Sequence, residues 1–84
     1  MTRREAVYGC ADALTLDVAA RLAQLAESRG ARLQLECGGK RVPLDSLIGI
    51  LALECRRGTR LTVIAEGEDE QAAAEAVARA LAGE

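Results

Sequence analysis

Two hydroxyl side chains, Thr15 and Ser46, directly precede stretches in which apolar residues recur at helical spacing. The N-terminus of a helix presents unpaired N–H groups and positive potential, so it can hold a phosphoryl group or another anion. A Ser or Thr oxygen at that position can instead accept a backbone N–H and act as the N-cap. From residue type alone, capping is the simpler interpretation of both residues and phosphoryl chemistry is the alternative.

The chain has no histidine, and this removes the commonest general base and phosphoryl-accepting side chain. A threonine hydroxyl with no adjacent base is a poor nucleophile. Asp17 suits the first turn of a helix, where the macrodipole favours a carboxylate, but it would repel an incoming phosphate donor. We therefore expect Thr15 and Asp17 to begin a helix, and we expect a protein that is not an enzyme and needs no cofactor.

The three cysteines are Cys10, Cys37 and Cys55, an odd number with no CxxC spacing. Without histidine they complete no mixed metal site, so we predict no metal and free thiols that are buried or partly buried. Cys10 is close in sequence to Thr15. A group transfer through Cys10, Thr15 or Asp17 is therefore a further alternative, and it is less favoured than a buried thiol.

Length and composition indicate one small domain covering residues 1–84, with a core of Leu, Ile, Val and Ala around the single aromatic residue, Tyr8. A net charge of −2 with 29% charged residues gives no field that would attract nucleic acid. The longest apolar run, Leu47–Leu53, is far shorter than the roughly 20 residues that cross a bilayer. The first nine residues lack the apolar segment of a signal peptide. We expect a cytoplasmic protein that binds neither nucleic acid nor membrane.

Periodicity predicts strands and helices in alternation. Residues 5–9 favour a first strand, and residues 12–30 favour a helix that Gly30 ends. That helix has an inward stripe of Leu16, Ala19, Leu22, Ala23 and Ala26. Strict alternation over 31–37 predicts a strand, and the Gly38–Gly39 turn predicts a hairpin into 40–43.

The remaining elements are a short helix over 45–55 that begins near Asp45 or Ser46, a strand over 60–67 and a helix over 68–84. The last helix has Glu68, Asp69 and Glu70 in its first turn and an inward stripe of Ala73, Val77 and Leu81. The strands alternate apolar and polar, so the sheet should have one covered and one wet face. We predict an α/β (α+β) open-faced sandwich, a four-stranded antiparallel sheet with three helices on one face in the order β-α-β-β-α-β-α.

The short helix has more apolar residues than one buried stripe needs. If Ile50 and Leu53 face the sheet, then Leu47, Ile48 and Leu51 face outward as a small apolar patch. Such a patch on a small domain usually contacts another protein. The alternative is that the first helix or residues 54–58 cover it.

The run GGKRVPLDSLIGILAL and the later run LTVIAEGEDEQAAAEAVARAL resemble HPr, the histidine-containing phosphocarrier of the bacterial sugar phosphotransferase system. The matching motifs are Gly39-Lys40 of a Gly-Lys hairpin, the segment Ser46–Leu51 of a Ser-Ile-Met-Gly-Val-Met pattern, and Ala65–Glu70 of an Ala-Glu-Gly-Glu-Asp-Glu pattern. The resemblance implies the same fold and covers the chain without gaps.

The N-terminal signature of that family, Leu-His-Ala-Arg-Pro-Ala-Ala, corresponds to residues 14–20 with its chemistry changed. Thr15 stands at the position of the phosphoryl-accepting histidine, Asp17 at that of an arginine and Val18 at that of the proline. Phosphocarrier activity by the family's route is therefore not expected. In lacking the histidine, the chain is similar to the catabolite-repression HPr-like proteins.

That likeness implies a regulatory protein in which Ser46 is phosphorylated by an HPr kinase and the modified domain binds a transcriptional regulator or another protein of the phosphotransferase system. The residues expected to contact the partner are Leu47, Ile48, Leu51, Thr15 and Asp17. The alternative is a module of the same fold that binds a partner, or a second copy of itself as a homodimer, without phosphorylation.

Overall fold

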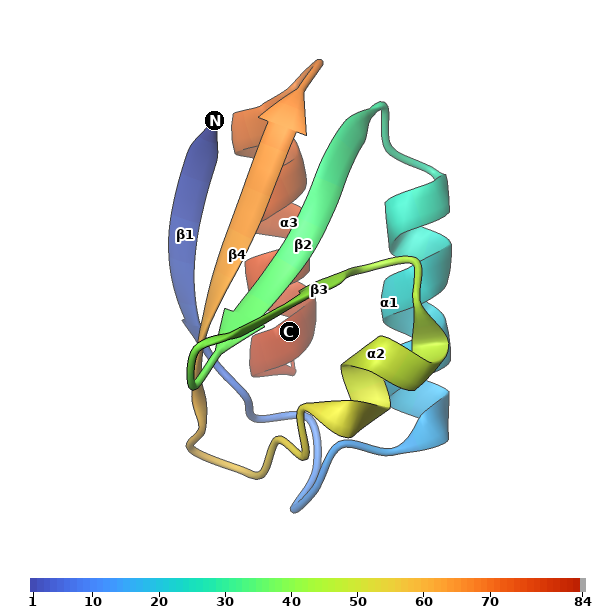
Figure 1. Ribbon diagram of the computed structural model, residues 1–84, viewed down its shortest axis with the longest axis vertical. Helices are drawn as coiled ribbons and strands as arrows, with labels where there is room; N and C mark the ends of the chain where they lie inside the picture. The colour runs from blue at the N-terminus through green and yellow to red at the C-terminus, as the bar shows by residue number, and fades with distance from the viewer. Residues whose placement is uncertain (84) are drawn as a thin grey trace.

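The computed structural model describes residues 1–83 as seven elements in chain order (Figure 1). They are β1 (Thr2–Val7), α1 (Leu16–Glu27), β2 (Ala31–Cys37), β3 (Lys40–Pro43), α2 (Leu47–Ala52), β4 (Arg60–Gly67) and α3 (Glu70–Ala82). No helix within these residues is long and apolar enough to cross a membrane.

The four strands form one antiparallel sheet in the spatial order β1-β4-β2-β3. The central strand β4 pairs with both neighbours, so Thr62 lies opposite Glu5 on one side and Glu36 on the other. Strands β2 and β3 form the predicted hairpin. Its turn residues, Gly38 and Gly39, have φ angles of +58° and +83°, a left-handed backbone that glycine adopts without a steric penalty.

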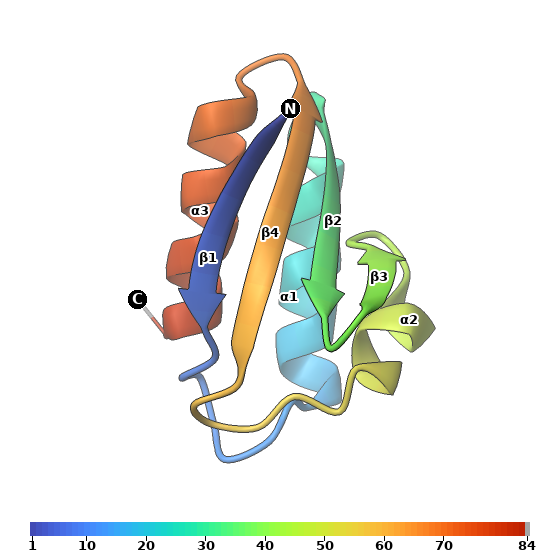
Figure 2. The same cartoon turned by 60° about the vertical axis from the view of Figure 1, so that its left-hand side comes forward.

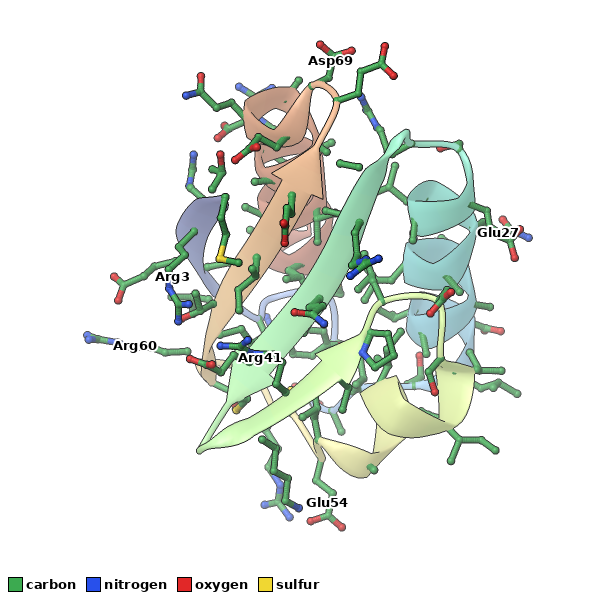
Figure 3. The ribbon with its side chains drawn as sticks, turned by 45° about the horizontal axis from the view of Figure 1, so that its top comes forward. Arg3, Glu27, Arg41, Glu54, Arg60 and Asp69 are labelled. Atoms are coloured by element: carbon green, nitrogen blue, oxygen red, sulfur yellow. The ribbon has the colours of Figure 1, made fainter. Side chains whose placement is uncertain are left out.

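Helices α1 and α3 lie behind the sheet, and α2 packs beside β3 and against α1 (Figures 1 and 2). On the open face, Arg3 and Arg41 both bind Glu36, at 2.9 Å and 3.0 Å (Figure 3). Hydrogen bonding from Arg41, with the charge of Arg3, lowers the pKa of Glu36. The predicted open-faced sandwich and its element order are confirmed.

The core lies between the sheet and the helices. Tyr8 is fully buried there, and its hydroxyl donates to the carbonyl of Ala13 at 3.0 Å. Burial raises the pKa of this phenol. Small side chains on the inward face of α3 permit close contact with the sheet, as expected for a core without Phe or Trp. The buried residues of α3 are Ala73, Ala74, Val77, Ala78 and Leu81.

The first strand and first helix differ from the sequence-based expectation. Strand β1 covers residues 2–7 and not 5–9. Its charged residues can belong to the strand because β1 lies at the edge of the sheet, where their side chains reach solvent. Helix α1 ends at Glu27 with Ser28 as C-cap, so Gly30 does not stop it. Leu16 was predicted to face inward but is 57% exposed. The buried stripe is centred on Val18 and Leu22, and Leu16 lies to one side of it.

The start of α3 also differs from expectation, since only Glu70 of the three acidic residues lies in its first turn. The Glu70 carboxylate accepts hydrogen bonds from the Thr2 hydroxyl at 2.6 Å and the Gly67 N–H at 3.4 Å, and it lies 2.9 Å from the amino group of Met1. These contacts lower the pKa of Glu70 to about 2 and fasten the start of β1 to α3.

The depressed pKa of Glu70 predicts a dependence of stability on pH. The pKa of Glu70 is about 2 in the folded protein and has its ordinary value of 4.5 in the unfolded chain. Between these two pH values the unfolded state binds more protons at this residue than the folded state does. The free energy of unfolding should therefore fall as the pH is lowered through this window. In Glu70→Gln the fall should be shallower and stability at pH 7 lower, measured by urea unfolding at a series of pH values.

The matched control is Glu27→Gln, which removes an exposed carboxylate at the end of α1. This variant should keep the steep fall of the unmodified protein. An equal flattening in both variants would contradict the role given to Glu70.

Candidate functional site

The tip of α1 is a capped helix end. The Thr15 hydroxyl accepts the Val18 N–H at 3.3 Å, and the Thr15 carbonyl accepts the Ala19 N–H at 3.0 Å. Asp17 is exposed in the first turn, where the macrodipole favours its charge. The predicted capping role of Thr15 is confirmed. Its hydroxyl oxygen accepts a backbone N–H, and within residues 1–83 no side chain hydrogen-bonds to this hydroxyl.

The tip of α2 is capped in the same way by Ser46. The Ser46 hydroxyl accepts the Gly49 N–H at 3.1 Å, and its carbonyl accepts the Ile50 N–H at 3.0 Å. Ser46 is half-buried, whereas the preceding residue, Asp45, is exposed. Of the two residues predicted to begin this helix, Ser46 is the cap.

Two loops hold the helices in their relative positions. Ala13 and Arg56 form an isolated antiparallel bridge, and the N–H of Leu14 donates to the carbonyl of Cys55 at 2.8 Å. The N–H of Arg57 donates to the carbonyl of Asp12 at 3.0 Å, and their side chains pair at 3.4 Å. The segment that leads into α1 is thus joined to the segment that follows α2.

The outer sides of the two helices carry exposed apolar residues. Ile48 is 83% exposed and Leu16 is 57% exposed. Leu47 and Leu51 are only partly exposed and pack against the core, so the outward face predicted for α2 is correct for Ile48 and only half correct for these two. Ile50 and Leu53 are buried, as predicted. We call Thr15, Leu16, Leu47, Ile48 and Leu51 the α1–α2 surface.

Sequence reasoning missed Leu16 as part of this surface. Position in the first turn does not by itself give the exposure, because Val18 in the same turn is only 5% exposed. Leu16 is exposed because it lies to one side of the stripe centred on Val18 and Leu22. The predicted inward stripe included Leu16 only because its spacing from Ala19 and Leu22 is helical.

The border of the α1–α2 surface is charged and irregular. Leu14, Leu51 and Glu54 line part of a shallow hollow of about 330 Å³ where α2 ends. Glu54 has a φ angle of +53°, a left-handed backbone that is unusual for a residue with a side chain. Its side chain extends away from the body of the protein in Figure 3. Asp17 at the start of α1 is a second exposed carboxylate, whereas the exposed Asp45 lines a different hollow with Ala26 and Glu27, near the end of α1.

Cys10 lies beside the first turns of α1, where it lines a hollow with Val18 and Arg21. The Cys10 thiol donates to the carbonyls of Ala80 and Leu81 at 2.8 Å and 3.4 Å, at the end of α3. All three cysteines are free thiols that are buried or half-buried, which confirms the prediction. In residues 1–83, no three His, Cys, Asp or Glu side chains converge to hold a metal ion.

Comparison with known proteins identifies relatives over nearly the whole chain. The family model described as the PTS HPr component phosphorylation site matches residues 3–83. The chain is 32% identical over 78 residues to the phosphocarrier protein HPr of Borreliella burgdorferi, a match that covers 93% of this chain and 91% of that protein. A crystal structure of HPr from Bacillus anthracis superposes with a TM-score of 0.89 at 29% identity, covering 95% of both chains.

A third relative is the HPr-like protein Crh of Bacillus subtilis, 48% identical over 44 residues. That match spans about half of each protein, 52% of this chain and 52% of Crh. The crystal structure of Crh superposes with a TM-score of 0.76 at 36% identity, covering 89% of this chain and 82% of that one, and it is described as a domain-swapped dimer.

The burial of the two isoleucines of α2 predicts opposite effects of truncation. Ile48→Ala should change the free energy of unfolding by no more than about 0.5 kcal/mol, because the side chain is already in water. Ile50→Ala removes a fully buried side chain and should cost about 2–5 kcal/mol. Urea unfolding of both variants measures the difference. Equal losses would show that Ile48 belongs to the core.

Proposed function

Since this chain belongs to the HPr family of the phosphotransferase system, we propose that it acts as a regulatory protein-binding module of that family and does not carry phosphate through the N-terminal tip of α1. HPr carriers contain a histidine that accepts the phosphoryl group, whereas this chain has no histidine. That difference supports the proposal. Its place of action is the cytoplasm, where the system's other proteins would meet it.

The tip of α1 is unsuited to phosphoryl relay on two counts. Thr15 uses its hydroxyl oxygen to cap the helix, and the chain has no histidine that could act as its base. Asp17 places a negative charge beside the position where a phosphoryl group would arrive, although the family's arginine at that position would attract it. A carrier site would need both the nucleophile and the local charge to change.

Ser46 is the residue that we propose is phosphorylated, by an HPr kinase. The proposal rests on the position of this capping serine, two residues before Ile48. Among residues 1–83, Ile48 is the most exposed large apolar side chain. A phosphoryl group on Ser46 Oγ would keep acceptor oxygens near the Gly49 N–H and add charge at the positive end of α2. It would thereby change the charge of the α1–α2 surface without requiring a new fold.

The partner that we propose is a protein, either a transcriptional regulator, the kinase itself or another phosphotransferase protein. Ile48 and Leu16 would supply the apolar contact, with Thr15, Asp17, Leu47 and Leu51 around them. Asp45 lies next to Ser46 and repels added phosphate, so the partner should supply the pairing cation, for which arginine is best suited.

The alternative is binding without phosphorylation, including self-association. The description of Crh as a domain-swapped dimer favours a homodimer as one form of this alternative. The exposed Ile48 would serve such an interface equally well, because apolar burial needs no phosphoryl group.

The missing histidine predicts a negative result in the phosphocarrier reaction. Incubation with radiolabelled phosphoenolpyruvate and the first enzyme of the phosphotransferase system should leave this chain unlabelled. A histidine-containing HPr in the same reaction should take up label and so verify the assay. Stable labelling of this chain would contradict the interpretation of Thr15 and Asp17.

Ser46 predicts a positive result with an HPr kinase and ATP. Intact mass should increase by one phosphoryl group, and Ser46→Asn should abolish the increase while keeping a good N-cap. Ser28→Ala is the matched control, because Ser28 is the only other serine and also contacts a helix end. No mass increase in the unmodified protein would contradict phosphorylation of Ser46. Binding without phosphorylation would then be the remaining alternative.

A further inference from the structure

The outer side of β1 is an edge of the sheet, and among residues 1–83 no strand pairs with it. The strand order β1-β4-β2-β3 joins β1 to β4 on its other side. In an antiparallel strand, alternate residues direct their N–H and C=O groups to opposite sides, so the outer side of β1 presents backbone donors and acceptors without a strand partner. Such an edge can accept an extended peptide as an additional strand.

A hollow of about 550 Å³ lies beside this edge, between β1 and α3. Its lining includes the small side chains of Ala6, Ala78 and Ala82, which leave room for the side chains of an added strand. Val7 also lines the hollow and is 49% exposed, a large apolar side chain that the α1–α2 surface does not include. The edge therefore offers apolar contact as well as backbone groups.

The same hollow is rich in guanidinium groups. Its charged lining residues come from β1, β4 and α3 and are Arg4, Glu5, Arg60, Glu75 and Arg79. Arg4 binds Glu75 through Nη1, and Arg79 binds the same carboxylate through Nε at 3.1 Å. Because each guanidinium has five N–H donors, these contacts leave most of the donors of both arginines available.

Arg60 is the least constrained of the three arginines. It stands opposite Val7 in the pairing of β1 with β4, and its side chain extends away from the body of the protein in Figure 3. None of the ion pairs within residues 1–83 involves Arg60. With three arginines and two glutamates, the lining of the hollow has a net positive charge, whereas the whole chain has a net charge of −2.

We propose that the outer edge of β1 binds an extended acidic segment of a partner protein as an additional strand. Backbone hydrogen bonds to β1 supply affinity, and Arg4, Arg60 and Arg79 select carboxylates at alternate positions of the segment. Charged side chains on an edge strand also oppose pairing with unmatched strands. The arginines therefore exclude basic segments as well as attract acidic ones.

The β1 edge and the α1–α2 surface lie at opposite edges of the sheet (Figure 1). Strands β1 and β3 are the two edges, and α2 packs beside β3. A segment bound at β1 leaves Ile48 uncovered, so both surfaces can be occupied at once. The proposal goes beyond the regulatory role proposed above and does not depend on phosphorylation of Ser46.

The test is fluorescence anisotropy with a labelled, end-capped heptapeptide in which glutamate alternates with valine or threonine. At about 0.15 M salt, where attraction between distant exposed charges is screened, the peptide should bind saturably. Arg60→Gln should weaken binding about threefold to tenfold, because one charge-assisted contact is lost and no ion pair of the folded protein is broken. The matched control is Arg29→Gln, which removes an exposed arginine beyond the end of α1 and should leave the affinity unchanged.

Two altered peptides separate strand addition from charge attraction. Replacing the glutamates by lysines should abolish binding. N-methylation of every second amide keeps the charge but removes the backbone donors on one side of the peptide. Tried in both registers, it should abolish binding in at least one of them.

Amide chemical shifts and hydrogen exchange locate the bound peptide. Amides of residues 4–7 and 75–82 should shift, and the outward amides of β1 should exchange more slowly in the complex. Residues 47–52 of α2 are the internal reference and should not change.

Several results would overturn the proposal. They are absence of binding, equal binding of the lysine peptide, full binding of the N-methylated peptide in both registers, and shifts centred on α2. A dimer joined through β1 in the absence of peptide, detected by analytical ultracentrifugation and abolished by Arg60→Gln, would make a second copy of the chain the occupant instead. All of these measurements use the unphosphorylated chain, so their outcome is separate from the fate of Ser46.

Discussion

The bridge between Ala13 and Arg56 is the contact on which the α1–α2 surface depends. It joins two loops that are more than forty positions apart in the sequence, and the flanking bond from Leu14 to Cys55 continues the pairing. On the inner side, the buried Tyr8 hydroxyl binds the carbonyl of the same Ala13. Thr15 and Ile48 lie on different helices, and this backbone pairing holds those helices side by side. The buried side chains of Ile50 and Leu53 then hold α2 against the core.

Helix capping and phosphoryl chemistry use the same physical feature, the unpaired N–H groups at the start of a helix. At Thr15 and Ser46 the serine or threonine oxygen already satisfies one such group. The two tips are alike in their backbone and in their neighbours, because each has an exposed carboxylate, Asp17 or Asp45, and an exposed apolar side chain, Leu16 or Ile48. They differ in degree, since Ile48 is 83% exposed and Leu16 is 57% exposed, and in the burial of the hydroxyl residue, since Ser46 is half-buried and Thr15 is exposed.

Local patterns predicted most of the fold because the elements that they describe are locally determined. The strict alternation of residues 31–37, the β-branched and apolar run in residues 60–67 and the glycine pair between β2 and β3 leave few other conformations. Contacts between distant residues were harder to predict. Strand β1 begins at Thr2 because Thr2 already pairs with Ala65 of β4, and Glu70 holds Thr2 and Met1 in place; nothing in the first five residues indicates these contacts. The exposure of Leu16 likewise depends on which face of α1 packs against the sheet, since Val18 and Leu22 are the buried residues.

Helix α2 also shows how a short helix can place a capping residue beside an exposed apolar one. Ile48 contributes little to the core and is free to change with a partner, but Ser46 must cap α2 while it remains half accessible. Gly49 makes this arrangement possible. A Cβ atom at Gly49 would lie 3.0 Å from Ser46 Oγ and 3.2 Å from the Cβ of Val42, tighter than ordinary packing allows. Because the glycine leaves that space open, the serine oxygen can sit over the first turn of the helix. A larger residue at position 49 would therefore disturb Ser46 by crowding, even though it would never touch a partner itself.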